Sequence, residues 1–275
     1  MVDVFSSAPL LGNPLAVVHD ADGLADEQMQ AIARWTNLSE TTFLLTPTDE
    51  SADYRVRIFT TGGELPFAGH PTLGSAHVWR SSGGSARLPG RFVQQCGAGL
   101  VPVREGERLA FAAPPLLRSG PPTAEERATV LAINGLVSED VVDLAWVDNG
   151  PGWMGVELRS AAAVLAARPD PAAYRGHKVT LLGRYAADEA ERLGKDVEVR
   201  AFYADDRDFA EDPVTGSANA GLAQWLIGAG RLPDRYVAGQ GQLLGRDGRV
   251  HVERLGDDIC VGGDVTTLVE GTMTL

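Results

Sequence analysis

Two short segments of the chain carry the same residue pattern, and each places an ionisable side chain directly before a proline. Residues 67–76 read FAGHPTLGSA and residues 209–218 read FAEDPVTGSA, 142 positions apart with six of ten residues identical. Proline is favoured at the first position of a helix, so the pattern predicts two helices with His70 and Asp212 at their N-caps. Free amides and the helix dipole at such starts favour an anion, such as a carboxylate or an enolate.

A histidine and an aspartate at matching positions suit a pair of groups with different proton-transfer roles. Taken singly, each has a structural interpretation: aspartate is a common N-cap residue, and a packed histidine often donates to a carbonyl. Their equivalence in a repeat favours the functional interpretation. Gly74 and Gly216 would let a ligand or a neighbouring helix approach closely. Ser217 is either a hydroxyl of the cap loop or a substrate contact.

The elements around these segments also repeat, which predicts two halves of the same fold. Residues 56–59 (VRIF) match residues 199–202 (VRAF) at a spacing of 143. Alternating and apolar patterns predict strands at 2–5, 16–18, 41–45, 54–60, 100–103, 109–112 and 197–203, helices at 22–35, 71–82 and 214–227, and a hairpin at 239–251. We therefore expect an α+β or a mixed α/β fold. If the halves face each other about a pseudo-twofold axis, both helix starts converge on one cleft.

A proline-rich stretch divides the two halves. Residues 113–122 contain four prolines, which is typical of a linker. We expect an N-terminal half over residues 1–117 and a C-terminal half over 118–275, with the last strand able to pack on the first half.

Composition excludes several classes of function. The chain has 275 residues and a formal charge of −13, which disfavours binding to nucleic acid. No apolar run approaches the ~18 residues of a membrane span, and the first residues read as a strand rather than a signal peptide, so we expect a cytoplasmic protein. Cys96 and Cys260 form neither a disulfide framework nor a metal-binding spacing.

Two other motifs have simple interpretations. The acidic run 205–208, together with Glu211, is better explained as a solvated loop than as a cation site. The glycine-rich run 239–245 resembles a dinucleotide-binding loop, but a strand follows it where such a loop needs a helix.

The ordered set of motifs resembles the PhzF-like family of phenazine-biosynthesis isomerases along nearly the whole chain. The motifs are DVF at 3–5, GNP at 12–14, NLSET at 37–41, RIFT at 57–60, FAGHP at 67–71 and EDPVTGSA at 211–218. The resemblance implies the fold of diaminopimelate epimerase, in which each half is a curved, mostly antiparallel sheet around a central helix. It also implies a homodimer, a small carboxylate-bearing substrate, and no cofactor or metal.

The resemblance also assigns site residues. The family's catalytic glutamate falls on Glu40, its histidine on His70 and its aspartate on Asp212. Its substrate-binding positions fall on Gly69, Gly216 and Ser217. In related epimerases two cysteines stand where His70 and Asp212 are expected here, so a two-cysteine mechanism is not predicted.

The resemblance implies that Glu40 moves a proton within a conjugated substrate such as trans-2,3-dihydro-3-hydroxyanthranilate. Two alternatives stay open. One is an epimerase of an amino or hydroxy acid, with His70 and Asp212 acting on opposite faces of one carbon. The other is a relative that binds a small anion without chemistry.

Overall fold

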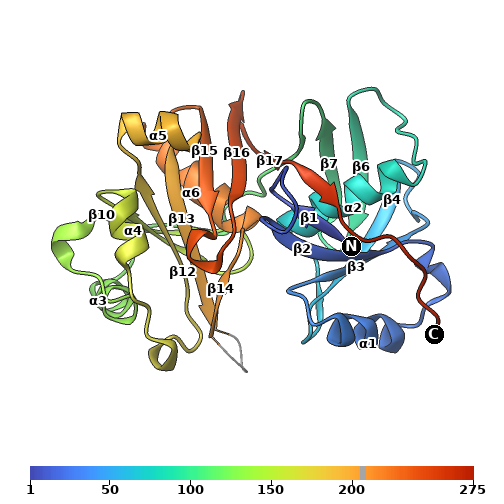
Figure 1. Cartoon of the computed structure of the whole chain (residues 1–275), viewed down its shortest axis with the longest axis horizontal. Coiled ribbons are helices and arrows are strands. Elements are labelled where there is room, and N and C mark those ends of the chain that lie inside the picture. The colour runs from blue at the N-terminus through green and yellow to red at the C-terminus, as the bar shows by residue number, and fades with distance from the viewer. Residues whose placement is uncertain (205–208) are drawn as a thin grey trace. The chain divides into compact units, whose positions relative to one another are not determined.

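The chain separates into two compact units that differ in their continuity along the sequence. The computed structural model describes residues 1–204 and 209–275, so the acidic run 205–208 lies outside the described residues. The first unit comprises residues 1–112 and 262–275, and the second comprises residues 113–261 (Figure 1). Among the described residues, none of the helices combines the length and apolarity needed to cross a bilayer.

The first unit is a mixed sheet in which a strand from the start of the chain pairs with a strand from its end. Its strands are β1 (Val2–Val4), β2 (Asn13–Val18), β3 (Thr41–Leu45), β4 (Tyr54–Phe59), β5 (Glu64–Leu65), β6 (Arg91–Cys96), β7 (Gly99–Glu105), β8 (Leu109–Ala112) and β18 (Val265–Thr267). They pair in the order β18-β1-β2-β3-β4-β6-β7-β8, with β5 beside the end of β4. The β2–β3 and β4–β6 pairs are parallel and the others antiparallel. The helices are α1 (Asp26–Thr36) and α2 (Gly69–Ser81), with a short 3-10 helix η1 (Ala21–Gly23).

The second unit repeats this order of pairing. Its strands are β9 (Arg118–Gly120), β10 (Val141–Asp148), β11 (Met154–Leu158), β12 (Lys178–Arg184), β13 (Val197–Ala204), β14 (Phe209–Asp212), β15 (Arg235–Gln240), β16 (Gly248–Leu255) and β17 (Asp258–Gly263), the last crossing the boundary between the units. They pair as β9-β10-β11-β12-β13-β15-β16, with β14 beside β13. Its helices are α3 (Ala124–Ile133), α4 (Ala161–Ala166), α5 (Ala187–Leu193) and α6 (Gly216–Gly228), with 3-10 turns η2 (Ser138–Asp140), η3 (Pro171–Ala173) and η4 (Gln242–Leu244).

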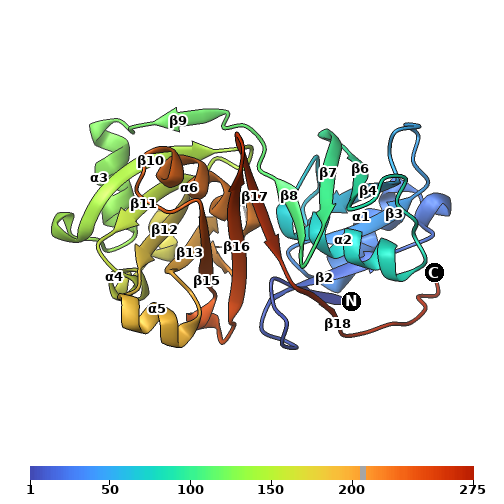
Figure 2. The same ribbon diagram turned by 90° about the horizontal axis from the view of Figure 1, so that it is seen from above.

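One helix is buried in each unit, and this confirms the predicted α+β class. In α2 the residues from Gly69 to Ala76 are all buried, and in α6 most residues are. Helix α2 packs on β1, β2, β3 and β8, and α6 packs on β10, β11 and β16 (Figure 2). The mostly apolar sequence of α6 agrees with its burial on several sides.

Glycines allow the buried helices to lie against their sheets. A Cβ on Gly74 of α2 would come within 2.5 Å of Leu15 Cδ2 on β2. A Cβ on Gly221 of α6 would come within 2.3 Å of the carbonyl oxygen of Val147 on β10. Because real Cβ atoms do not approach so closely, a Cβ at Gly221 would displace the backbone of β10, and a Cβ at Gly74 would displace the side chain of Leu15.

Three details of the sequence interpretation are wrong. Helix α2 has Ala68 as its N-cap and α6 has Thr215, so His70 lies inside α2 and Asp212 ends a strand. Helix α1 is preceded by Ala25 rather than capped by Asp22 or Asp26, and Asp22 instead accepts a hydrogen bond from the amide of Thr46. The segment predicted as a linker contains β9, which pairs with β10. The hairpin predicted at 239–251 is confirmed as part of β15 and β16.

Candidate active site

Glu40 stands at the entrance to β3, directly after the turn that ends α1. Asn37 closes α1 in a left-handed conformation (φ 53°), and the chain then reverses into β3 through residues 38–40. Strand β3 is held in the middle of the sheet between β2 and β4, and the Ser75 hydroxyl of α2 donates to Thr42 at 2.9 Å. The Glu40 side chain is 16% exposed, so the carboxylate sits at the edge of the core.

His70 is the second residue of α2, and its ring faces Glu40. Its Nε2 lies 3.6 Å from Oε2 of Glu40, and its Nδ1 lies 3.5 Å from the side-chain amide nitrogen (Nδ2) of Asn13. Burial lowers the pKa of His70 to about 3, so the imidazole is neutral at neutral pH. Because an amide nitrogen donates, Nδ1 is the accepting nitrogen and the ring proton is on Nε2, directed at Glu40.

The GNP motif provides the neighbour of His70. Asp3 accepts a hydrogen bond from the amide of Gly12 at 2.9 Å, and this fixes the turn that enters β2. A Cβ on Gly12 would come within 2.2 Å of the carbonyl oxygen of Val4, so the turn needs glycine. Asn13 follows and is fully buried against the His70 ring. The DVF and GNP motifs therefore cooperate to set the environment of His70.

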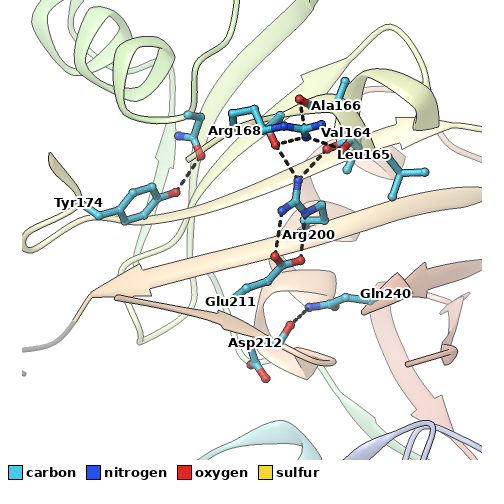
Figure 3. Close-up of polar contacts among 11 residues, drawn as sticks. Val164, Leu165, Ala166, Arg168, Tyr174, Arg200, Glu211, Asp212 and Gln240 are labelled. Atoms are coloured by element: carbon cyan, nitrogen blue, oxygen red, sulfur yellow. Dashed lines mark hydrogen bonds and ion pairs between the residues drawn. The ribbon is translucent and has the colours of Figure 1, made fainter. Parts of the chain in front are cut away.

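In the second unit, Glu211 and Asp212 are neighbours on β14, and their side chains point to opposite faces of the strand. Successive side chains of a strand point to opposite faces. Figure 3 shows Glu211 turned toward Arg200 of β13 and Asp212 turned away from it. Arg200 grips both carboxylate oxygens of Glu211 at 2.9 Å and also donates to the carbonyls of Val164 and Ala167 near the end of α4. The charge of Glu211 is thereby compensated, separately from Asp212.

Asp212 is held by the residues that lead into α6. Thr215 donates its hydroxyl to Oδ2 of Asp212 at 2.7 Å. Gln240, at the end of β15, donates to the backbone carbonyl of Asp212 at 3.0 Å (Figure 3). Asp212 is therefore fixed through both its side chain and its backbone.

Gly216 and Ser217 are the first two residues of α6. The indole nitrogen of Trp153 donates to the Ser217 hydroxyl at 2.9 Å. The side-chain amide of Asn149 donates to the backbone carbonyl of Ser217 at 2.9 Å. Both partners come from the turn between β10 and β11, where Asp148 accepts the amides of Gly150 and Gly152. The position of Ser217 is thus set by that turn.

The starts of α2 and α6 are suited to an anion. Neither helix has a side-chain hydrogen bond from its N-cap residue. Their first amides, at Gly69 and His70 and at Gly216 and Ser217, have no partner within the helix by geometry, and the helix dipole adds positive potential.

The structural repeat has a different register from the sequence repeat. Arg57 binds Glu64 in the first unit just as Arg200 binds Glu211 in the second, through two parallel hydrogen bonds. Phe59 pairs with Glu64 and Phe202 with Glu211, so the connecting hairpin is four residues longer in the second unit.

The spacing of equivalent residues beyond this hairpin is therefore 147. It relates Gly69 to Gly216 at the helix starts, and Gly74 to Gly221 at the close contacts with the sheet. His70 is thus equivalent to Ser217, and the predicted equivalence of His70 with Asp212 is wrong. The turns agree with this register, since Asn13 contacts His70 and Asn149 contacts Ser217.

Several residues that shape the site were missed from the sequence. Thr215 and Gln240 contact Asp212, and Asn149 and Trp153 contact Ser217. Thr215 lies inside the EDPVTGSA motif and could have been singled out there. The run NGPGW at 149–153 also shows the turn chemistry of a functional loop. No local pattern singles out Gln240.

Known proteins share this sequence and fold. The sequence model of phenazine biosynthesis-like protein, named PhzC-PhzF, matches residues 2–271. The chain is 34% identical to antisense-enhancing sequence 1 of Schizosaccharomyces pombe, over 98% of this chain and 96% of that one. It is also 34% identical to trans-2,3-dihydro-3-hydroxyanthranilate isomerase of Pseudomonas aeruginosa, over 93% and 90% of the two chains.

A solved structure shows the same fold. A predicted epimerase from Pseudomonas aeruginosa superposes with a TM-score of 0.78 at 28% identity, covering 100% of this chain and 98% of that chain. This agrees with the epimerase-like fold that the motifs implied. The chain belongs to the phenazine biosynthesis-like family of isomerases.

Proposed function

We propose that this protein is a cofactor-independent isomerase that moves a proton within a small carboxylate-bearing substrate, with Glu40 as the proton carrier. The observation that carries the proposal is the contact between Glu40 and the buried, neutral His70, whose Nε2–H points at the carboxylate from 3.6 Å. At 3.6 Å the two atoms are too far apart for a hydrogen bond, but an N–H dipole directed at a carboxylate stabilises its negative charge electrostatically. Glu40 is thereby supported as a base rather than as an acid in the resting enzyme.

The proposed step conserves the proton. The Glu40 carboxylate takes a proton from an activated carbon, and the electron pair of the broken C–H bond spreads into the conjugated system. Protonated Glu40 then delivers the same proton to another carbon of that system. In the first unit, the amide of Gly69 at the start of α2 is suited to hold the substrate carboxylate. In the second unit, the amides of Gly216 and Ser217 are suited to an anion, and Asp212 would accept a hydrogen bond from an amine or hydroxyl.

The names of the relatives guide the choice of a substrate to test. The Pseudomonas aeruginosa relative is named for trans-2,3-dihydro-3-hydroxyanthranilate, and the Schizosaccharomyces pombe relative at the same identity carries a different kind of name. We therefore propose this compound as the first substrate to test, and a small conjugated carboxylate as the class.

The test is proton NMR of the protein with trans-2,3-dihydro-3-hydroxyanthranilate in deuterated water. We expect loss of substrate with deuterium entering a ring carbon, and no change with Glu40→Gln. Glu50→Gln, an exposed loop residue of the same unit, is the matched control and should react as the wild type does. Turnover by Glu40→Gln at the wild-type rate would contradict the role of Glu40.

The epimerase alternative is favoured by one observation, the similarity to a predicted epimerase at 28% identity. Its proposed pair of bases loses support, because His70 and Asp212 are not equivalent in the structural register. Inversion at a single carbon, with deuterium at that carbon alone, would identify this activity. Binding of the compound with no exchange at any carbon would instead indicate a non-catalytic relative.

A further inference from the structure

We infer that Gln240 is a positioning residue that acts through Thr215 to hold the carboxylate of Asp212 ionised and in one orientation. The inference rests on the proposed function in so far as Asp212 contacts the substrate. It adds two residues, Gln240 and Thr215, to the residues that the motifs assign to the site.

The first step is the complete hydrogen bonding of a buried amide. Gln240 is 1% exposed, and its side chain makes four hydrogen bonds. Its Oε1 accepts from the backbone amide of Thr215 and from the side-chain amide of Asn219, each at 3.0 Å. Its Nε2 donates to the Asp212 carbonyl at 3.0 Å and to the Thr215 hydroxyl at 2.9 Å. A fully bonded buried amide has one orientation and resists rotation.

The second step is the direction of the protons. A backbone N–H can only donate, so the Gln240 atom facing the amide of Thr215 must be the oxygen. The atom facing the Thr215 hydroxyl is then the NH₂ group, and the hydroxyl oxygen acts there as an acceptor. The single hydroxyl proton of Thr215 is therefore available for Oδ2 of Asp212, 2.7 Å away. A hydrogen bond that points into a carboxylate stabilises its ionised form.

The third step is a comparison with the first unit, which has a buried glutamine but no chain of hydrogen bonds from that glutamine through a hydroxyl to a carboxylate. Gln94 of β6 is buried and donates to the Thr72 hydroxyl of α2 at 3.0 Å, while Tyr54 donates to Gln94 at 3.1 Å. Thr72 binds the carbonyl of the N-cap residue Ala68, as Asn219 binds that of Thr215. A buried glutamine thus anchors the helix start in both units. Ala68 has no hydroxyl to extend the contact, so the path to Asp212 exceeds what anchoring the helix requires.

The charged groups around Asp212 agree with this role. On its own strand Glu211 turns to the opposite face, where Arg200 of β13 compensates its charge. The described residues that hold Asp212 from the helix start and from β15 are Thr215 and Gln240, and both are uncharged. From these two elements, Asp212 is therefore oriented by hydrogen bonds from uncharged donors.

The experiment compares variants of the hydroxyl. Thr215→Val keeps the shape and loses the proton, and Thr215→Ser restores it. Since a hydrogen bond to a charged group is worth a factor of about 10 to 100, Thr215→Val should lower kcat on trans-2,3-dihydro-3-hydroxyanthranilate by that factor. Thr215→Ser should return kcat to within about threefold of wild type. Tyr174→Phe controls for a general loss of stability, because it also removes a buried hydroxyl donor, which binds Asn134 at 2.9 Å. This variant should leave kcat unchanged.

Gln240→Glu tests the glutamine itself. The carboxylate keeps the acceptor for Thr215 and Asn219 but offers no donor, so the Thr215 proton turns to it and leaves Asp212. We expect a loss of kcat at least as large as in Thr215→Val. A folded Thr215→Val protein with wild-type kcat, or an equal loss in Tyr174→Phe, would overturn the inference.

A second measurement needs no substrate and separates this inference from the proposed function. Protein labelled with ¹³C at the aspartate carboxyl carbons gives a resonance for Asp212, identified by its absence in Asp212→Asn. At fixed neutral pH this resonance should move in Thr215→Val and stay in place in Thr215→Ser. Inactive wild-type protein with this pattern would reject the proposed substrate and retain the positioning role. An unmoved resonance in Thr215→Val would reject the positioning role whatever the activity.

Discussion

The close contacts of the buried helices predict that three helical glycines respond differently to alanine. A Cβ on Gly221 would meet a backbone carbonyl oxygen at 2.3 Å, and a Cβ on Gly74 would meet a rotatable methyl of Leu15 at 2.5 Å. A Cβ on Gly228, the exposed last residue of α6, would meet nothing within 4 Å. The three sites share a helical backbone and differ in what the new methyl group meets.

The magnitudes follow from two opposing effects. Alanine is preferred to glycine in a helix by up to about 1 kcal/mol, and overpacking costs about 1–3 kcal/mol. At Gly221 the backbone of β10 has to shift, so we expect a net loss of about 2 kcal/mol. At Gly74 the methyl of Leu15 can rotate, so the free energy of unfolding should stay within about 1 kcal/mol of wild type. Gly228→Ala should gain about 0.5–1 kcal/mol.

Urea denaturation of the three variants beside the wild type measures these differences, and the midpoint of each transition gives their order. The expected order of stability is Gly228→Ala first, then wild type and Gly74→Ala, then Gly221→Ala. A Gly221→Ala protein as stable as Gly74→Ala would refute the account of how α6 packs on β10. It would also remove one support for the register that relates the two units.

Two further predictions concern buried charge. The pKa of His70 falls from 6.5 in the unfolded chain to about 3 in the folded protein, so its contribution to stability is complete above pH 6.5 and is lost as the pH falls toward 3. This amounts to about 2 kcal/mol at pH 5, and His70→Gln should lack that loss in unfolding measurements at pH 8 and pH 5; equal losses in both proteins would contradict it. Arg200→Met should cost about 3–5 kcal/mol because it leaves Glu211 nearly buried and uncompensated. The acidic partners of Arg57 are more exposed, so Arg57→Met should lower the free energy of unfolding by about 1 kcal/mol or less. Similar losses for both arginine variants would show that burial does not determine how much each ion pair stabilises the fold.

Much of the fold could be predicted from local sequence because the strands alternate and the turns carry glycine and proline. The helix starts could not be placed from proline alone. Pro71 is the third residue of α2, where a missing amide costs little because the first four amides of a helix lack partners anyway. Pro213 lies before α6, and the N-cap of this helix is Thr215, two residues further on.

The register of the repeat could not be read from residue identity. The similarity between residues 67–76 and 209–218 aligns prolines that play different structural roles. The correct register appears in tertiary contacts, in which Gly74 and Gly221 each meet a strand and Arg57 and Arg200 each bind a glutamate. Residue type marks chemistry, but equivalence between units depends on packing partners that are distant in sequence.

The candidate site was predictable only in part, because motifs identify residue types and tertiary packing brings the residues together. Glu40 and His70 were assigned from motifs, and their proximity depends on β3 and α2 packing in one unit. Gln240 was not predictable, because it reaches Asp212 only through the parallel pairing of β13 with β15. That pairing joins segments about 40 residues apart and has no local signature.

The return of the chain to its first sheet has a consequence for biosynthesis. Val2 pairs with Thr267 and Val4 with Val265, whereas the second unit is one uninterrupted stretch. On the ribosome, residues 113–261 emerge in full before β18, which pairs with the edge of β1 opposite to β2, has been translated. Until then β1 offers an open edge, which is a template for pairing with a neighbouring nascent chain. A stop codon just before Val265 should therefore yield a protein whose second unit is intact and whose first unit self-associates through β1.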